Sequence, residues 1–232
     1  MEKQLQRSKI VLFLAASLIA VGLFMHFTNQ PMPEQPTYQT KAHLPQSHVK
    51  YAGALGVGEE APRFALPDHN GEVFSLEKAL EKGPVVLTFF RGNWCPICAA
   101  HLKSLSLAKD KVNAHGGQLV ALSAQTPAKT ALTQQQFGID FPVLSDPEMQ
   151  VTKAYGVGWQ IPEEDRPDFK AWLDKTTGQS LNDYQVTGEY TLPVPATYVI
   201  APGGEVIYAH VDEDYRDRAE PEKIIEALKA IN

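Results

Sequence analysis

Two apolar segments of strand length, separated by a helical segment, constrain the fold of this chain most strongly. Residues 84–90 read PVVLTFF and residues 118–123 read QLVALS, each with few polar interruptions. A strand that is apolar on both sides belongs to a sheet that is covered on both faces. Residues 96–115 between them repeat apolar side chains at helical spacing, and Gly116 follows. A strand, a helix and a second strand in this order predict an α/β fold.

The rest of the chain continues this alternation. Asn70-Gly71 predicts a tight turn leading into a short strand at residues 73–75. We also expect helices at residues 76–82, 126–137, 147–155 and 221–231, a strand at 141–144, and a strand pair at 196–200 and 205–209. Residues 157–192 are polar and aromatic without a clean period. They predict an insertion packed beside a central mixed sheet that is flanked by helices.

Composition excludes several classes of protein. Apolar residues make up 44% of the 232, which is enough to bury a core. The formal net charge of −6 argues against a nucleic-acid partner, because neutralising phosphates requires a basic surface. The chain has only two cysteines, Cys95 and Cys98, so it is neither a disulfide-dense scaffold nor an all-cysteine zinc site.

Residues 1–27 combine a basic start with an apolar run. Lys3, Arg7 and Lys9 precede residues 10–27, which carry no formal charge. This pattern predicts an uncleaved membrane anchor, with a cleaved signal peptide as the first alternative and a buried soluble helix as the second. Positive charge before the anchor predicts that the rest of the chain lies outside the cytoplasm, in the periplasm if the cell is bacterial. Cleavage would instead give a secreted protein.

Residues 28–52 contain four prolines and little apolar periodicity, which is typical of a linker. Residues 53–232 then form the domain, with 16 basic and 25 acidic residues. The chain is thus predicted to consist of an anchor, a proline-rich linker and one acidic domain.

The pair Cys95-Pro96-Ile97-Cys98 follows a buried strand and opens a helix. Proline is favoured at the first position of a helix. The amides and dipole at a helix N-terminus stabilise an anion, so we expect Cys95 to ionise more easily than a free thiol. A spacing of three residues lets Cys98 reach Cys95 and close a disulfide. We interpret the pair as a redox couple in which Cys95 attacks and Cys98 resolves.

Other interpretations of the pair are weaker. His101 could join the cysteines in a metal site, but no fourth ligand lies nearby in the sequence. Covalent haem attachment would need histidine at position 99, where the chain has Ala99. A purely structural disulfide would close almost no loop and so stabilise little. We therefore expect no metal and no other cofactor.

Residues 89–98, FFRGNWCPIC, resemble the signature of the thioredoxin fold. Residues 58–68, 144–147 and 154–157 resemble segments of the peroxiredoxin branch, the alkyl hydroperoxide reductase C/thiol-specific antioxidant family, and the similarity extends from about residue 58 to 231. It implies a thioredoxin-like fold and a thiol peroxidase with Cys95 and Cys98 as its redox pair. Residues 194–197 resemble the cis-proline loop, which implies that Pro195 faces the dithiol.

The sequence also departs from these patterns. Typical peroxiredoxins have Pro-x-x-x-Thr/Ser-x-x-Cys at the peroxidatic cysteine, whereas residues 91–94 here read RGNW. Thioredoxins carry a buried acid six residues before the first cysteine, and this chain has Phe89. Arg91 is a candidate to activate the thiolate or bind peroxide, with a paired surface arginine as the alternative. Trp94 is expected to shield the dithiol. Residues 212–220 are interpreted as a solvated charged loop, with a role for Arg216 or Arg218 as the minor alternative.

Three functions follow for testing. The first is reduction of hydrogen peroxide or organic hydroperoxides, with a thioredoxin-like or other thiol reductant as partner and the membrane as anchor. The second is a membrane-tethered thiol-disulfide oxidoreductase that acts on proteins. The third is a binding module without enzymatic activity.

Overall fold

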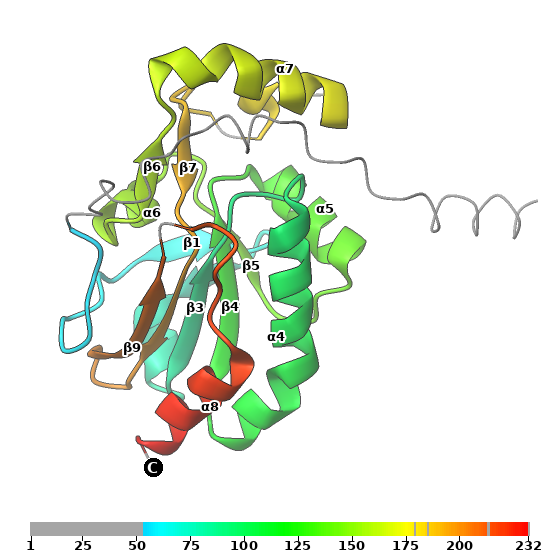
Figure 1. Cartoon of the computed structure of the whole chain (residues 1–232). Helices are drawn as coiled ribbons and strands as arrows, with labels where there is room; N and C mark the ends of the chain where they lie inside the picture. Colours follow the sequence, from blue (N-terminus) through cyan, green and yellow to red (C-terminus); the bar gives the residue numbers. More distant parts are fainter. Residues whose placement is uncertain (1–52, 179, 185, 213, 232) are drawn as a thin grey trace, which may run out of the picture. The chain divides into compact units, whose positions relative to one another are not determined.

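The computed structural model describes residues 53–231, apart from residues 179, 185 and 213. Among them, no helix has both the length and the apolar character needed to span a membrane. The anchor and linker expected at residues 1–27 and 28–52 lie outside the described residues. The described part forms an α/β domain around one mixed sheet (Figure 1).

The central sheet has five strands in the order β5-β4-β3-β8-β9. Strands β3, β4 and β5 run parallel, and β8 pairs antiparallel with both β3 and β9. Their bounds are β3 Val85–Phe89, β4 Gln118–Ser123, β5 Val143–Ser145, β8 Ala196–Ile200 and β9 Val206–Val211. The two apolar segments that dominate the sequence are therefore adjacent strands at the middle of the sheet.

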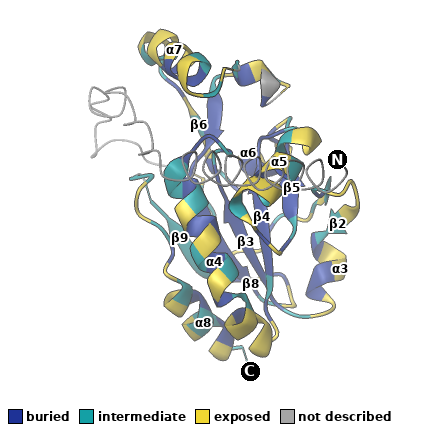
Figure 2. Cartoon of the chain, turned by 90° about the vertical axis from the view of Figure 1, so that its right-hand side faces the viewer, coloured by how far each residue is buried: buried dark blue, intermediate teal, exposed yellow. Residues whose placement is uncertain are grey.

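Alternate residues of these strands enter two separate cores. Val86 and Phe90 face one core, whereas Leu87 and Phe89 face the other. The first core is closed by α4 (Pro96–Ala114) and α8 (Pro221–Lys229), the second by α3 (Leu76–Leu80) and α6 (Gln150–Ala154). Figure 2 shows the central strands fully buried and the helices buried along one side only. This two-faced burial explains why β3 and β4 lack polar alternation.

The elements expected from the sequence are present with small shifts of their ends. Strands β1 (Ala65–Pro67) and β2 (Val73–Ser75) form the expected hairpin, and Gly71 adopts a φ of 82° in its turn. Helix α5 spans Pro127–Phe137 and ends at Gly138, which adopts the left-handed conformation. The prediction of an α/β fold with a central mixed sheet flanked by helices is confirmed.

The insertion is more regular than its sequence indicates. It starts with β6 (Gly158–Gln160), continues through helix α7 (Arg166–Thr177) and returns along β7 (Thr191–Pro193), which pairs antiparallel with β6. Phe169, Trp172 and Leu173 are buried, at the spacing of one helix face. Figure 1 shows α7 beyond the end of the central strands rather than beside the sheet. Its buried side chains nevertheless join the core on the α4 side of the sheet, as the expected packing against the sheet requires.

Candidate active site

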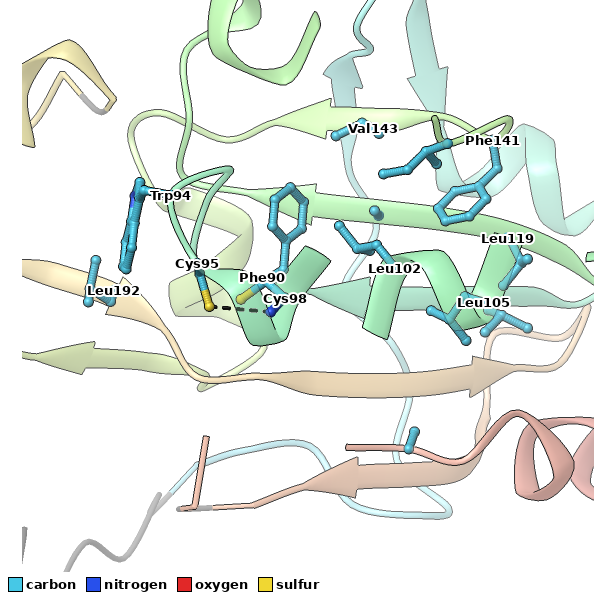
Figure 3. Close-up of a cluster of buried hydrophobic side chains, with 14 of the residues drawn as sticks. Phe90, Trp94, Cys95, Cys98, Leu102, Leu105, Leu119, Phe141, Val143 and Leu192 are labelled. Atoms are coloured by element: carbon cyan, nitrogen blue, oxygen red, sulfur yellow. Dashed lines mark hydrogen bonds between the residues drawn. The ribbon is translucent and has the colours of Figure 1, made fainter. Parts of the chain in front are cut away.

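Both cysteines lie on the first turn of α4, directly after β3. Cys95 is the N-cap residue with extended backbone angles, and Pro96 occupies the first helical position. The Cys98 backbone N–H donates to Cys95 Sγ at 3.3 Å (Figure 3). The Cys95 sulfur thus occupies the place that a serine or aspartate oxygen takes in an ordinary helix cap. No disulfide joins the two cysteines, and the first turn of the helix holds them as neighbours.

An aromatic cover, made of Trp94, Phe169 and Trp172, packs beside the pair. Trp94 meets Phe169 and Trp172 edge-to-face, with ring centroids 5.8 and 5.5 Å apart. Figure 3 also shows Trp94 beside Leu192 of β7. Cys95 is only 3% exposed and Cys98 is fully buried. Trp94 thus shares a buried cluster with both cysteines, and its role as a shield stays a prediction.

The loop that carries Trp94 is held by polar contacts. The Asn93 amide donates to Gln136 at 3.0 Å and accepts from Gln125 at the same distance. Gln125 is buried and also accepts from Thr133 at 2.9 Å. Gly92 leaves room for the indole, because a Cβ at this position would lie 2.5 Å from Trp94 Nε1. The hydrogen bonds of Asn93 and the close fit of Gly92 to Trp94 therefore hold the segment that leads to Cys95.

Two arginines border the sulfurs. The Arg91 guanidinium stacks over the Tyr215 ring, 4.2 Å from its centroid. The Arg218 Nη2 atom donates to Cys98 Sγ at 3.6 Å. Arg91 Nε and Arg218 Nη1 are buried and have no hydrogen-bond partner among the described residues. The sequence pointed to Arg91, whereas it made Arg218 only the minor alternative in a solvated loop.

The charges around the pair reverse the expected order of ionisation. The hydrogen bond between the thiols raises the pKa of Cys95 well above its ordinary value, and burial adds to this. Burial would also raise the pKa of Cys98. The hydrogen bond from Cys95, the Arg218 guanidinium and the Arg91 backbone outweigh burial and lower the Cys98 pKa to about 5. These opposite shifts favour the negative charge of the reduced pair on Cys98 over Cys95.

Pro195 lies at the same end of the sheet as the cysteines. It precedes Ala196, which pairs with Phe89 at the end of β3. The implied cis bond is not present, because none of the described peptide bonds is cis. Val194 N–H donates to Val157 O at 2.7 Å, which ties this stretch to the start of the insertion. Pro195 thus lies next to the strand end that leads to the cysteines, but it lacks the cis peptide bond that the resemblance implies.

Sequence reasoning gave Tyr215 no role, considered His101 only as a metal ligand, and gave Arg218 a role near the site only as a minor alternative. Tyr215 and Arg218 lie in residues 214–219, which we call the arginine loop. His101 lies on α4, is buried, and contacts the carbonyl of Ala219 through Nε2 at 3.2 Å. A signal existed for His101, since it falls three residues after Cys98 on the buried face of the helix. None existed for Arg218, because charged loops are usually solvated.

Comparison with known proteins decides the family. The family model described as AhpC/TSA family matches residues 57–209. The chain belongs to this family. The match covers most of the described domain, including β3, both cysteines and β8. Members of the family and the relatives below are thiol-dependent oxidoreductases of the thioredoxin-fold type, so the general enzyme class expected from the sequence is confirmed.

Curated relatives are similar over a shorter range. The thiol-disulfide oxidoreductase ResA of Bacillus thuringiensis (strain Al Hakam) is 32% identical over 105 residues, which cover 45% of this chain and 60% of that protein. ResA of Bacillus subtilis (strain 168) is 30% identical over 105 residues and is covered to 58%. The chain thus spans about 60% of the length of these relatives.

Solved structures share the fold at low identity. Peroxidoxin BcpB of Mycobacterium tuberculosis has a TM-score of 0.60 and 22% identity, over 77% of this chain and 99% of that chain. Peroxiredoxin Q of Xanthomonas campestris has a TM-score of 0.54 and 16% identity, over 72% of this chain and 90% of that chain. At this identity the likeness concerns the fold alone.

Proposed function

We propose that this chain is a thiol-dependent peroxidase that reduces hydrogen peroxide or organic hydroperoxides through Cys95 and Cys98. One observation carries the proposal: two buried thiols are bordered by guanidinium groups whose buried N–H groups lack partners among the described residues. A hydroperoxide is small enough to approach a sulfur that is 3% exposed, and its oxygens accept hydrogen bonds. Unpaired buried donors cost free energy, which such a substrate would recover.

The first step uses the shared proton of the pair. Cys98 thiolate accepts the proton of the Cys95 thiol through their hydrogen bond, which gives the Cys95 thiolate. This thiolate attacks one peroxide oxygen, so that the S–O bond forms while the O–O bond breaks. The leaving hydroxide or alkoxide takes the proton from Cys98 and departs as water or alcohol. Cys95 is then a sulfenic acid, and Cys98 is again a thiolate.

The second step closes the cycle locally. Cys98 thiolate attacks the Cys95 sulfur, the S–S bond forms, and hydroxide leaves and is protonated to water. A thioredoxin-like or other thiol reductant then supplies two electrons and two protons to restore the dithiol. Arg91 and Arg218 would stabilise the departing oxygen anions. Trp94 would allow only small oxidants to reach Cys95. Pro195 would border the same space from the start of β8.

The N-terminal segment bears on where this occurs. Its basic start and apolar run support a membrane anchor, with the catalytic domain outside the cytoplasm. Detergent-dependent extraction of the full chain, compared with a variant lacking residues 1–27, would test the anchor. Release of the full chain by high salt alone would contradict it.

Peroxide consumption by the full-length protein tests the activity. Hydrogen peroxide and cumene hydroperoxide are offered separately with dithiothreitol as the donor. We expect turnover by the wild type and none above background by Cys95→Ser. Equal rates for the two proteins would overturn the proposal.

Thiol-disulfide exchange with other proteins is the second candidate. It is favoured by the Cys-x-x-Cys turn itself and by the named activity of the ResA relatives. The rate of Cys95 oxidation by hydrogen peroxide, compared with the rate by oxidised glutathione, separates the two. Faster oxidation by glutathione disulfide, together with a mixed disulfide trapped in Cys98→Ser, would favour the exchange reaction.

A further inference from the structure

The arginine loop brings a charge to the second cysteine rather than to the first. Arg218 Nη2 lies 3.6 Å from Cys98 Sγ, although 120 residues separate them in the chain. Cys98 is fully buried, so water does not screen this contact. A charge at this sulfur therefore interacts strongly with the guanidinium, which never loses its proton.

Two contacts fix the position of Arg218. Its Nε donates to the carbonyl of Tyr215 within the same loop at 2.8 Å. The carbonyl of the next residue, Ala219, contacts Nε2 of His101 at 3.2 Å. His101 follows Cys98 by three residues on α4, so a single helix carries both the sulfur and the anchor of its guanidinium partner.

The acidic residues of the arginine loop are engaged elsewhere. Asp214 pairs with Arg216, with 2.8 Å between Oδ1 and Nε, and Asp217 lies 3.3 Å from the His210 ring. Arg218 forms no ion pair with a carboxylate among the described residues. Its charge also acts on Asp214, but the side chain to which it donates among the described residues is Cys98, so a structural salt bridge does not account for its position.

We propose that Arg218, held in place by His101, makes Cys98 the preferred leaving thiolate and so makes Cys95–Cys98 an oxidising couple that thiols readily reduce. The proposal deepens the proposed function, since it concerns the recycling step of the same pair. A thiol of low pKa leaves faster in disulfide exchange, and a couple whose reduced form is stabilised is a stronger oxidant. Such a couple suits an enzyme that must be re-reduced after each turnover.

The recycling step is two successive thiol-disulfide exchanges. A donor thiolate attacks the Cys95 sulfur, a mixed disulfide forms, and the electron pair of the Cys95–Cys98 bond moves to Cys98. A second donor thiolate attacks the donor sulfur of the mixed disulfide and releases Cys95 as a thiolate, which takes a proton. The donor is oxidised to its disulfide by two electrons, and the pair is reduced by two. Arg218 faces the sulfur on which the charge first appears.

The test is the redox equilibrium of the full chain with reduced and oxidised glutathione. The fraction of disulfide is measured by alkylation and mass spectrometry for the wild type, Arg218→Gln, Arg218→Lys and Arg216→Gln. Arg216 is a matched control, because it is an exposed arginine two residues away that pairs with Asp214. We expect Arg218→Gln to shift the equilibrium at least tenfold toward the disulfide, which corresponds to about 30 mV.

The other variants sharpen the outcome. Arg216→Gln should stay within about twofold of the wild type, and Arg218→Lys should fall between the wild type and Arg218→Gln, since a lysine keeps the charge but loses the planar fork. Equal equilibria for Arg218→Gln and Arg216→Gln would overturn the proposal.

His101 variants decide the matter if Arg218→Gln does not fold. His101→Leu removes the contact to Ala219 and should shift the equilibrium in the same direction, whereas His101→Gln keeps a donor and should restore much of it. If neither His101 variant departs from the wild type, the proposed positioning role is wrong. The measurement uses no peroxide, so a protein that shifts as expected but consumes no peroxide would contradict only the proposed function.

Discussion

The aromatic cover and the arginine loop reach the same pair of cysteines with different chemistry. Trp94, Phe169 and Trp172 offer ring edges and faces and no formal charge, and they pack in the same buried cluster as Cys95. The arginine loop offers the guanidinium of Arg218 to Cys98. On the proposals above, this difference separates two tasks: the cover would limit what reaches the first sulfur, and the loop would set how well the second sulfur bears charge.

The largest expected effect comes from exchanging the two sulfurs separately for oxygen. Cys95→Ser should abolish peroxide turnover, since no nucleophile remains at the entry. Cys98→Ser should consume about one peroxide per chain and stop at a Cys95 sulfenic acid, because the resolving sulfur is lost. Peroxide counts and trapping with dimedone measure both outcomes.

The contrast between these two variants is the control. Sustained turnover by Cys98→Ser with dithiothreitol would show that the donor resolves the sulfenic acid directly. A sulfenic acid on Cys98 in the Cys95→Ser variant would show that the assigned order of attack is wrong.

Opening the aromatic cover should give the next largest effect. Trp172→Ala removes a buried ring in contact with Trp94, a change that typically costs about 3–5 kcal/mol of unfolding free energy. We expect Cys95 to react about tenfold faster with a bulky disulfide reagent, whereas its reaction with hydrogen peroxide should change little. Stopped-flow measurements with both reagents compare the rates.

Leu107→Ala on the exposed side of α4 is the matched control, because Leu107 is 79% exposed. It should leave both rates and the stability within error of the wild type. If Trp172→Ala increases the rates of Cys95 with the bulky disulfide and with hydrogen peroxide equally, the aromatic cover does not discriminate by size.

His101, which contacts the arginine loop at Ala219, should make the free energy of unfolding depend on pH. Burial and the nearby Arg218 lower the pKa of His101 to about 4, from an ordinary value of 6.5. The unfolded chain therefore binds more protons between these values, so the unfolding free energy falls as pH drops from 6.5 to 4. The loss attributable to this residue is on the order of 2–3 kcal/mol.

Urea unfolding of the wild type and His101→Gln at pH 7 and pH 4.5 measures this loss. The wild type should lose more stability on acidification than the variant, which has no titrating group at this position. An equal loss in the two proteins would mean that other groups account for the acid sensitivity.

The framework of the fold was accessible from the sequence because its signals are local. Apolar segments, the Cys-Pro start of α4 and the glycines at turns each act within a few residues, and they predicted the strands and helices that carry the cysteines. Helix α7 escaped because only one of its faces is apolar and its mean polarity is high. Its buried residues at positions 169, 172 and 173 have helical spacing, but they are too few to stand out from the polar residues around them.

The electrostatics of the site were not accessible in the same way. The helix N-terminus is a local feature and correctly indicated an N–H group directed at Cys95. It said nothing of Arg218, which tertiary packing brings to Cys98 from 120 residues away and which, after the hydrogen bond from Cys95, lowers the pKa of that thiol. The ionisation of a coupled pair depends on every group that faces it. A motif alone can therefore identify the reactive residues, but it does not predict which of them ionises first.

The smallest expected effect tests how the aromatic cover depends on one glycine. A Cβ at position 92 would lie 2.5 Å from Trp94 Nε1 and 3.0 Å from Trp94 Cδ1, so the indole must shift in Gly92→Ala. Forcing a side chain into a packed site typically costs about 1–3 kcal/mol. Gly203→Ala is the matched control, because a Cβ there meets nothing within 4 Å. Urea unfolding measures the cost, and tryptophan fluorescence reports the displaced ring.

Because Arg218 approaches the other sulfur, the glutathione equilibrium should stay within about twofold of the wild type in Gly92→Ala. A larger shift would mean that the cover and the arginine loop do not act separately on the pair.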